Sequence, residues 1–486
     1  MNNSQPDNLK MYIGGQWIKS ESEKTFNAYN PATNEVIATL PEGTRNDAQR
    51  AIAAANENKH KIANMSVWER SHLCRRIADV MEQRKEELAR VLTEDQGKPY
   101  YTEALPEVEF AIHGFQNASE QVKWLETSVI PVENPSKRVF SFRQPRGVYA
   151  VITPWNFPIN IPVEYLAPGL AAGNAIVWVP APTTSVCAVK LMECLEEAGV
   201  PPGVVNLVTG PGPVVGDEIV AHPGTQAVGF TGSPQTGKHI AQRAAGKALL
   251  LELGGNGPTI ILNDADIELA GAAVASACFF NAGQVCSATE RILVQRHAHD
   301  ELAERLVAAA QSIRLGDPFD QTTTMGPLNN QPTAEKMNRH LADGVEKGAT
   351  VLFGGERAAG LGSNLFYSPT VIDNISSDSM LNNEESFGPV APLMTFDDYE
   401  EALSIAVNNN YGLISAVFTG NIKNAFYFAE RVRTGIVNIN DSSNYWESHI
   451  PFGGVSGTDS GIGRLGGKHT LMAMTDLRTI CLDVSR

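Results

Sequence analysis

One cysteine of this sequence lies where a side chain could act as a nucleophile. Cys286 belongs to the stretch FFNAGQVCSATE, Phe279 to Glu290, which follows an apolar, alanine-rich run with helical spacing. Asn281 to Gly283 are residues that admit a left-handed turn, so we expect them to end the helix and put Cys286 on a loop. Val285 and Ser287 are small enough for a substrate to reach the sulfur, whose thiolate is a strong nucleophile. A buried structural cysteine is the alternative, because free cysteines are mostly buried.

Two further polar residues stand near the ends of apolar, strand-like segments. Glu252, in LELGGN, is an unexpected carboxylate there, because an unpaired charge is costly to bury. It could be a general base whose raised pKa lets it activate Cys286 or a water molecule, or it could be a salt-bridged or exposed glutamate. Asn156, between two prolines in VITPWNFP, could stabilise an oxyanion with its amide, or it could form a turn.

A glycine-rich segment could bind a phosphate group. FTGSPQTGK, Phe230 to Lys238, lies between an expected strand and an expected helix. Its glycines permit close approach of the backbone, and a helix start offers free N–H groups and a positive dipole end to a pyrophosphate. The segment is not the G-x-G-x-x-G fingerprint, so a plain structural turn is the alternative.

Strands that alternate with helices are expected to position these residues. The first block is predicted to have strands at 148–152, 175–178, 204–208, 227–230 and 248–251, and helices at 161–172, 185–198, 214–221 and 237–245. The second block, from about Thr259 to Ile450, is predicted to have strands at 259–262, 292–294, 350–353, 370–372 and 415–418. Alternation predicts parallel, doubly wound sheets that bind ligands beyond the carboxyl ends of their strands. Two α/β lobes with a cleft between them are therefore expected.

Other segments surround these two blocks. Residues 11–40 are predicted to form short strands, and helical spacing is found at 47–62, 67–96 and 105–124. Residues 126–144 alternate polar and apolar side chains, which predicts a strand pair that the strand-like segment 479–484 could join. Such an excursion could pair with another subunit, or it could be a solvated hairpin.

Composition excludes some partners. The net charge of −16 argues against nucleic acid and against an anionic membrane surface, so a small-molecule ligand is expected. Residues 1–10 lack the apolar core of a signal peptide, and no apolar run reaches the roughly 18 residues of a membrane span, so we expect a cytoplasmic protein. The six cysteines are scattered and predict neither a disulfide framework nor a metal site: Cys74, Cys187, Cys194, Cys278, Cys286 and Cys481.

Six segments together resemble the motifs of the aldehyde dehydrogenase superfamily, in the same order and at similar spacing: TPWNFP, GFTGSPQTG, LELGG, FFNAGQVCSA, EESFGPV and PFGGV. The similarity covers nearly the whole chain. It implies that Cys286 is the nucleophile, that Glu252 is the general base, and that Asn156 and the backbone N–H of Cys286 hold the oxyanion. Cys278, at the end of the apolar helix, is expected to be structural.

The resemblance also implies an architecture and a cofactor. We expect a Rossmann-like, doubly wound cofactor domain (residues 1–122 and 145–252), an α/β catalytic domain (253–465) and a small β oligomerisation extension (123–144 and 466–486), in a homodimer or homotetramer. The cofactor is expected to be NAD, with NADP possible. The implied cofactor-binding residues are Thr153, Pro154, Trp155, Gly232, Ser233, Gly237, Leu253, Glu385 and Phe387. The implied substrate contacts are Phe157, Val285, Ser287, Tyr445 and His449.

The implied reaction is the oxidation of an aldehyde to a carboxylate through a cysteine thiohemiacetal and a thioester that water hydrolyses. A CoA-acylating enzyme is one alternative, although Glu252 provides a base for water. A cysteine hydrolase or acyltransferase that needs no nicotinamide is another, although no His/Asp partner motif accompanies Cys286. A binding protein without activity is a third.

Some positions depart from the family pattern. Val179 stands where relatives often have a ribose-binding lysine, and Pro182 stands where a glutamate often favours NAD, so the choice between NAD and NADP is open. Glu164 and Tyr165 are also atypical. A two-residue insertion between Ser456 and Ser460 is expected beside the substrate mouth. The loop NDSSNYWESH, Asn440 to His449, has polar and aromatic residues that favour a small oxygenated or anionic aldehyde over a long alkyl chain.

Overall fold

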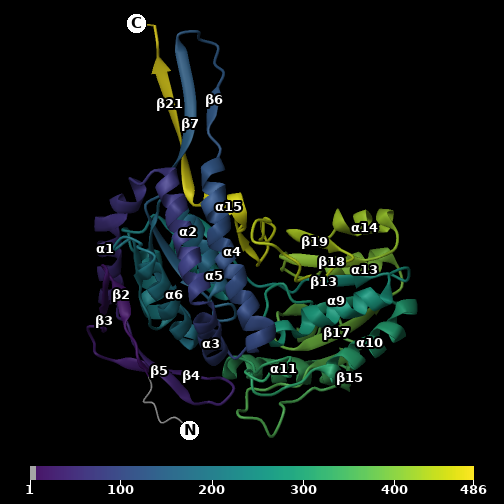
Figure 1. The fold of residues 1–486 in the computed structure, drawn as a ribbon. Coiled ribbons are helices and arrows are strands. Elements are labelled where there is room, and N and C mark those ends of the chain that lie inside the picture. Colours follow the sequence, from purple (N-terminus) through teal and green to yellow (C-terminus); the bar gives the residue numbers. More distant parts are fainter. Residues whose placement is uncertain (1–6, 486) are drawn as a thin grey trace.

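The computed structural model describes residues 7 to 485. Two α/β lobes stand side by side, and a long β extension projects from the first of them (Figure 1). The first lobe is built on an eight-stranded sheet, the second on a seven-stranded sheet, and the extension on a three-stranded sheet. This arrangement confirms the predicted fold class of two parallel, α/β-wound lobes with a small β extension.

The central strands of the first lobe are parallel, in the order β12-β11-β8-β9-β10. They are β8 (Val148–Thr153), β9 (Ala175–Pro180), β10 (Val205–Leu207), β11 (Ala227–Thr231) and β12 (Ala248–Glu252). Antiparallel strands complete the two edges: β20 (Gly461–Ile462) beside β12, and β2 (Met11–Ile13) with β3 (Gln16–Ile18) beside β10. The crossovers contain α5 (Asn160–Ala171), η3 (Pro182–Thr184), α6 (Ser185–Glu197), η4 (Gly212–Gly216), α7 (Asp217–Ala221) and α8 (Pro234–Arg243).

Helices from the amino-terminal part of the chain cover this sheet. They are α1 (Arg45–Ala63), α2 (Val67–Gln83), α3 (Lys85–Gln96), η1 (Tyr100–Ala104), α4 (Leu105–Gln121) and η2 (Val122–Trp124). The helix predicted over 67–96 is in fact two helices, because Arg84 leaves helical geometry (φ −104°, ψ 15°). A small separate sheet consists of β1 (Asp7–Asn8), β4 (Thr25–Tyr29) and β5 (Val36–Pro41).

The second lobe has strand order β15-β16-β17-β14-β13-β18-β19. Its strands are β13 (Pro258–Ile261), β14 (Arg291–Gln295), β15 (Thr350–Phe353), β16 (Thr370–Asp373), β17 (Val390–Phe396), β18 (Ile414–Phe418) and β19 (Ile436–Ile439). Its helices are α9 (Ile267–Phe279), η5 (Phe280–Gly283), η6 (Arg296–Ala298), α10 (His299–Ser312), α11 (Gln331–Glu346), α12 (Met380–Asn383), α13 (Tyr399–Ala406) and α14 (Ile422–Ala429). Strands β17 and β19 were not predicted. Pro392 interrupts the pattern of β17, since proline is rare inside strands, and β19 is only half-buried.

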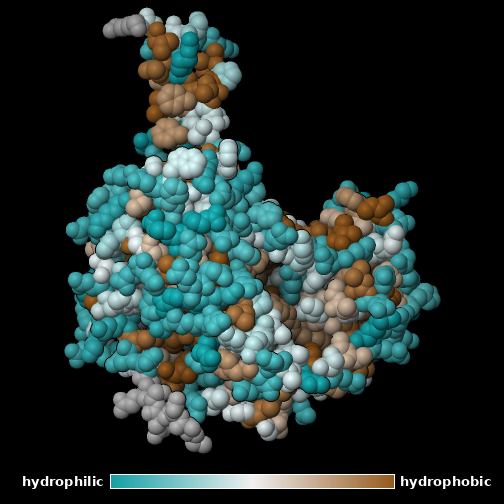
Figure 2. Space-filling model, in the orientation of Figure 1, coloured by the Kyte–Doolittle hydropathy of each residue, from teal (hydrophilic) through white to brown (hydrophobic). Residues whose placement is uncertain are grey.

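The extension consists of β6 (Ser128–Ile130), β7 (Lys137–Pro145) and β21 (Thr475–Asp483), and α15 (Gly467–Ala473) leads into it. Strand β21 pairs antiparallel with β7 along its full length, from Thr475 opposite Pro145 to Asp483 opposite Lys137. The predicted pairing of these two distant segments is thereby confirmed. Exposed apolar side chains gather on this sheet (Figure 2), among them Val129, Phe140, Leu477 and Leu482.

Within residues 7 to 485, no helix is both long and apolar enough to cross a membrane. The prediction that the chain begins without a signal peptide concerns residues 1–10, of which 1–6 lie outside the described residues.

Candidate active site

The loop that carries Cys286 begins with an unusual turn. Helix α9 ends at Phe279, and Asn281, Ala282 and Gly283 then have φ values of 51°, 53° and 72°. The turn is held from outside, because the Asn281 backbone N–H donates to Glu103 Oε1 at 3.0 Å. A side chain at Gly283 would collide with the backbone oxygen of Gly388. The predicted helix end and loop are therefore confirmed, and the turn fixes the approach to Cys286.

Cys286 lies where two cavities meet. One has a volume of about 250 Å³ and the other of about 560 Å³. Both are lined by Cys286, Glu252 and Thr231. A small molecule in either cavity can therefore contact the sulfur and the carboxyl group. The other cysteines of α2, α6 and α9 are fully buried; Cys278 donates its thiol hydrogen to the backbone oxygen of Thr289 at 3.2 Å, as expected of a structural cysteine.

Glu252 is buried at the carboxyl end of β12. It is paired in register with Thr231 of β11, which places both side chains at the ligand-binding edge of the first sheet. Glu252 is 3% exposed, and its Oε1 atom has no hydrogen-bond partner among the described residues. Burial, followed by the charges of Glu164 and Glu385, raises its pKa well above the ordinary value. The salt-bridged and exposed alternatives for Glu252 do not hold in this structure.

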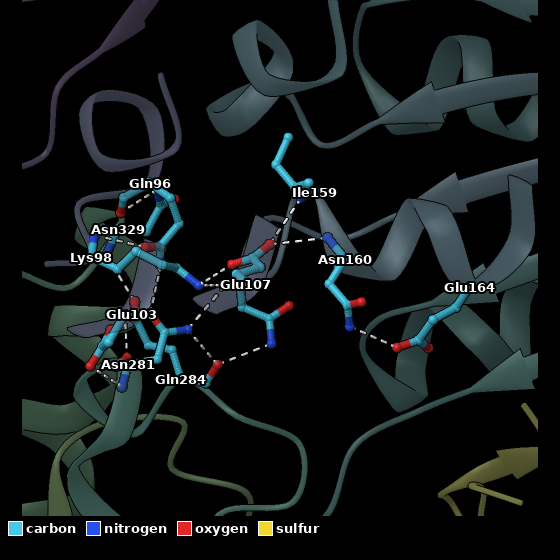
Figure 3. A network of polar contacts seen from close by, with 11 residues as sticks. Gln96, Lys98, Glu103, Glu107, Ile159, Asn160, Glu164, Asn281, Gln284 and Asn329 are labelled. Atoms are coloured by element: carbon cyan, nitrogen blue, oxygen red, sulfur yellow. Dashed lines mark hydrogen bonds and ion pairs between the residues drawn. The ribbon is translucent and has the colours of Figure 1, made fainter. Parts of the chain in front are cut away.

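Asn156 follows β8 and points its amide toward the cysteine loop. Its Nδ2 atom donates to the backbone oxygen of Gln284 at 3.0 Å, so one of the two amide hydrogens fixes the side chain and the other stays available. Its backbone oxygen accepts hydrogen bonds from Lys98 Nζ and Asn281 Nδ2, both at 3.0 Å (Figure 3). A buried network therefore joins Asn156 to the turn before Cys286.

A buried ion pair completes this network. Lys98 Nζ lies 2.5 Å from Glu107 Oε2, and the two side chains are 0% and 2% exposed. The other carboxylate oxygen of Glu107 accepts the backbone N–H groups of Ile159 and Asn160 at the start of α5. Lys98 thus fixes the backbone of Asn156, and Glu107 fixes the start of helix α5. Sequence reasoning missed this pair, because nothing in the spacing of the two residues shows that their side chains meet.

The pKa of the Cys286 thiol is raised well above its usual range. Burial is the largest cause, and the charges of Glu252, Glu385 and Glu164 add to it. The resting sulfur therefore carries its proton, and a nearby base must accept that proton before the sulfur can attack. Glu252, which lines the same two cavities, is placed to do so once it has lost its own proton, because burial raises its pKa as well.

The smaller cavity contains some of the predicted substrate residues but not all of them. Phe157, Val285 and Ser287 line it. Tyr445 and His449 do not: both side chains are exposed, and both turn toward Glu447. Their neighbours Asn444 and Trp446 line the cavity instead. Tyr445 and His449, predicted as substrate contacts, therefore do not line this cavity, because the direction of a side chain on an irregular loop depends on what packs against it. Trp446 packs between Phe110 and Phe452, with ring centroids 5.4 Å from each.

The larger cavity is lined by most of the predicted cofactor residues: Pro154, Trp155, Gly232, Ser233, Leu253, Glu385 and Phe387. Two of the predicted residues lie beneath its wall. Thr153 is buried and accepts a hydrogen bond from Trp178 Nε1 at 2.9 Å, and a side chain at Gly237 would collide with Leu253. Lys336, which was not predicted, also lines the cavity, with its Nζ 5.6 Å from the centre of the Phe387 ring.

The residues of the larger cavity fit a dinucleotide. Ser233 caps the amino terminus of α8 by accepting the backbone N–H of Thr236, and the helix start beside it offers a positive dipole end to phosphate groups. At the inner end, Glu385 presents a carboxylate that can accept ribose hydroxyls, and its Oε1 now accepts the backbone N–H of Gly255 at 2.9 Å. Trp155 and Phe387 stand edge to face beside it, with centroids 5.5 Å apart.

The insertion between Ser456 and Ser460 was expected beside the substrate mouth, and the structure places it elsewhere. Asp459 pairs with Lys238 of α8 at 2.9 Å, and Ser460 Oγ donates to the backbone oxygen of Gly254. No residue of the insertion lines either cavity. The segment therefore braces the cofactor side of the site, because it packs against the helix and the strand end there.

Comparisons with known proteins agree with this geometry. Residues 17–480 match the aldehyde dehydrogenase family. The chain is 38% identical to an alpha-ketoglutaric semialdehyde dehydrogenase of Bacillus subtilis, over 92% of this chain and 93% of that protein. It is 37% identical to a lactaldehyde dehydrogenase of Methanocaldococcus jannaschii, over 97% of this chain and 100% of that protein.

Two solved structures have nearly the same fold as this chain. An aldehyde dehydrogenase of Bacillus cereus, in complex with NAD+, superposes with a TM-score of 0.95 at 36% identity and covers 99% of this chain and 97% of its own. An NADP-dependent enzyme of E. coli superposes with a TM-score of 0.95 at 33% identity and covers 99% of each chain. The chain belongs to the aldehyde dehydrogenase family, as its motifs predicted. It is an NAD(P)-dependent oxidoreductase that converts an aldehyde to a carboxylate.

Proposed function

We propose that Cys286 is the nucleophile of this reaction, that Glu252 is its general base and that Asn156 stabilises the oxyanion. The observation that carries the assignment is the position of Cys286 and Glu252 at the meeting point of the two cavities. An aldehyde in the smaller cavity and a dinucleotide in the larger one would both reach the sulfur. The structural-cysteine alternative remains suitable for Cys278.

The chain's own groups would act in sequence. Glu252 accepts the thiol proton of Cys286, and the sulfur forms a bond to the aldehyde carbon. The carbonyl oxygen becomes an oxyanion that the free N–H of Asn156 Nδ2 and the backbone N–H of Cys286 hold. After the carbon has been oxidised, a thioester links it to the sulfur. Glu252 releases the first proton to solvent and then takes a proton from a water molecule that attacks the thioester, and the carboxylate leaves as the thiolate is released.

NAD(P)+, when bound in the larger cavity, supplies the hydride acceptor for the oxidation. Residues of the cavity that would hold it are Glu385 and Phe387 at the inner end and Ser233 at the start of α8. NAD is the preferred cofactor in this proposal and NADP is possible. Val179 is buried and apolar at the end of β9, and Pro182 is exposed, so neither offers a charge to the adenosine ribose.

We further propose a small oxygenated or anionic aldehyde as the substrate. The relatives above are named for a semialdehyde and for lactaldehyde, which are small molecules with additional oxygen atoms. The cavity of about 250 Å³ suits a short molecule, and the polar side chains of Asn160, Ser287 and Asn444 line it. A long alkyl chain would place apolar carbon against these polar groups.

The extension is proposed to assemble the chain into a homodimer or homotetramer. The apolar side chains on β6, β7 and β21 are exposed in a single chain, and a second copy would bury them. In this proposal residues 1–122 and 145–252 form the cofactor domain, 253–465 the catalytic domain, and 123–144 with 466–486 the extension. A cytoplasmic location suits the enzyme because the cytoplasm keeps a catalytic thiol reduced.

A panel of aldehydes, run with NAD and with NADP, tests the proposal. Formation of reduced cofactor and carboxylate without added CoA is expected, and its loss in Cys286→Ala is the matched control. A strict requirement for CoA would instead support the acylating alternative. Product formation from an ester or thioester with no nicotinamide would support the hydrolase alternative. Unchanged turnover in Cys286→Ala would refute the assigned nucleophile.

A further inference from the structure

The smaller cavity contains a carboxyl group that the proposed reaction does not use. Glu164 lies on α5 and lines both this cavity and a neighbouring one of about 30 Å³. Its Oε1 accepts a hydrogen bond from Asn160 Nδ2 at 2.9 Å, and its Oε2 has no partner among the described residues (Figure 3). An acceptor at the wall of the substrate cavity therefore remains unmet.

The other unmet polar atoms of the same cavity are also acceptors. Glu103 is 4% exposed, and its Oε2 has no partner within the described part of the chain. The Oε1 atom of Glu252 is likewise unpartnered. Buried polar atoms normally find hydrogen-bond partners, so these carboxyl oxygens, once ionised, indicate a ligand that carries donors.

The polar side chains of the cavity wall each make a hydrogen bond within the protein, and among the described residues only the second amide hydrogens of Asn160 and Asn444 are left over. Asn160 Nδ2 donates to Glu164, and Ser287 Oγ donates to Asn444 Oδ1 at 2.7 Å. Asn444 Nδ2 donates to the backbone oxygen of Ala277, and the hydroxyl groups of Thr231 and Tyr165 share a hydrogen bond at 2.7 Å. The wall thus offers a ligand more acceptors than donors.

The charges of the cavity point in the same direction. Among residues 7 to 485, no lysine, arginine or histidine lines it, whereas four glutamates do: Glu103, Glu107, Glu164 and Glu252. Lys98 is the cation of the adjoining network, and it is fully buried and already paired with Glu107. A negatively charged group in this cavity would therefore meet carboxyl groups and no free counter-ion, and its desolvation would not be offset.

Resting on the proposed function but excluding its anionic case, we propose that the aldehyde substrate carries a hydrogen-bond donor at its far end, a hydroxyl or an ammonium group, and that Glu164 accepts this donor. Glu164 is then the residue that selects the substrate, while Glu252 and Cys286 carry out the chemistry. The aromatic walls formed by Phe110, Phe157 and Trp446 suit the carbon chain of such an aldehyde and can also face an ammonium group.

Glu164 also acts on the reaction centre through its charge. Burial raises the pKa of its carboxyl group to about 8. Glu164, Glu252 and Cys286 line the same cavity, and the charge of Glu164, when it is ionised, raises the pKa of both Glu252 and Cys286. An ammonium group bound to Glu164 would offset that charge, so occupation of the far end of the cavity by a cation would ease deprotonation of the sulfur.

The test compares kcat/KM at about pH 9, where the Glu164 carboxyl group is mostly ionised, for a three-carbon alkanal and for its terminal hydroxyl, ammonium and carboxylate derivatives. In the unchanged enzyme the hydroxyl or ammonium derivative should exceed the alkanal by about 10- to 100-fold, as expected of a hydrogen bond to a charged group, and the carboxylate should be the poorest. Glu164→Leu should abolish the advantage and leave the alkanal within about 3-fold, since that substrate loses no hydrogen bond.

A second variant separates the two kinds of donor. Glu164→Gln keeps a neutral acceptor of the same shape, so it should retain a preference for the hydroxyl derivative and lose a preference for the ammonium one. Gln121→Leu is the matched control; it changes a polar side chain of the neighbouring small cavity that does not line the substrate cavity, and it should alter none of the four values.

The pH dependence of Cys286 alkylation by iodoacetamide provides a second measurement. It would not change if Glu164 had only a structural role. Both Glu164 variants should shift the pH midpoint of alkylation to lower values, because a negative charge near the thiol is removed. A variant that fails to fold would expose Cys74, Cys187 and Cys278 as well, which mass spectrometry of the labelled peptides detects.

Two results would overturn the inference. One is a carboxylate derivative with the highest kcat/KM in the unchanged enzyme, and the other is an equal loss for all four substrates in Glu164→Leu. The absence of cofactor reduction with every aldehyde would instead refute the proposed function, so the two failures are distinguishable.

Discussion

Replacing Asn156 with alanine tests the proposed oxyanion site. The amide of Asn156 donates one hydrogen to the Gln284 backbone oxygen at 3.0 Å and leaves the other free for substrate. Removal of one such donor typically lowers kcat by about 10²- to 10³-fold, or about 2.7 to 4 kcal/mol of transition-state stabilisation. We expect a loss in this range in Asn156→Ala, with little change in KM, because the donor acts on charge that develops after binding.

The structure indicates that the substitution leaves the loop in place. The Gln284 oxygen keeps a hydrogen bond from Asn281 Nδ2 at 3.3 Å, and Lys98 holds the backbone oxygen of residue 156 rather than its side chain. Alkylation of Cys286 by iodoacetamide forms no oxyanion, so its rate should stay within about 2-fold of the unchanged enzyme. Asn156→Asp keeps the size of the side chain but removes the donor and adds a charge, so it should be at least as slow as the alanine variant.

Steady-state kinetics and alkylation together decide the outcome. A fall in kcat of less than about 5-fold in Asn156→Ala would refute the assigned oxyanion role, since a lost donor costs far more than that. An equal fall in the alkylation rate would show that the substitution had displaced the loop instead.

Other expectations follow from the same geometry. Glu252→Gln should slow both the first release of reduced cofactor and the steady-state turnover, the latter by about 10²- to 10⁴-fold, because the Cys286 thiol and the water that attacks the thioester both lose their base. Stopped-flow absorbance measures both phases, and a full steady-state rate would contradict the role. Lys98→Met should lower the free energy of unfolding by about 3 to 5 kcal/mol, since it leaves the buried carboxylate of Glu107 unpaired, and adding Glu107→Gln should restore part of this loss in a denaturant titration. The rate of Cys286 alkylation in the enzyme without cofactor should rise with pH only above the ordinary thiol pKa of about 8.5, because burial raises the pKa of this thiol in the folded enzyme. The reactive thiolate is therefore lost as the pH falls through that raised pKa. A rate that is already constant at neutral pH would contradict this expectation. Pro182→Glu should lower kcat/KM for NADP by about 10-fold and leave that for NAD unchanged, since a carboxylate near a phosphate dianion costs roughly 1 to 2 kcal/mol in water; equal effects on both would argue against contact at that position.

The sequence predicted the architecture of both lobes well, because the local spacing of apolar residues distinguishes strands from helices. The strands from β8 to β12 lie where the apolar segments predicted them. Where a local rule was broken, the prediction failed. Pro392 concealed β17, and no local signal marked the break between α2 and α3 at Arg84. The tertiary contacts of the sheet override such local preferences.

The sequence alone determined which residue types could do the chemistry and their order along the chain. Cys286, Glu252 and Asn156 each stand at the end of an element, and the topology of α/β sheets brings such ends to one edge. Only the tertiary structure decided that Cys286 and Glu252 share two cavities, and that burial and neighbouring carboxylates raise the pKa of both.

The tertiary structure also decided which neighbours complete the site. Whether Tyr445 or Trp446 faces the cavity depends on the aromatic rings that pack against the loop, and these come from distant parts of the chain. The partners of Lys98 and the unmet oxygen of Glu164 are likewise set by elements far away in sequence. Local spacing identifies a reactive residue because the segment around that residue determines the turn on which it lies. The packing of remote segments determines the pKa of the reactive side chain and the substrate that its cavity accepts.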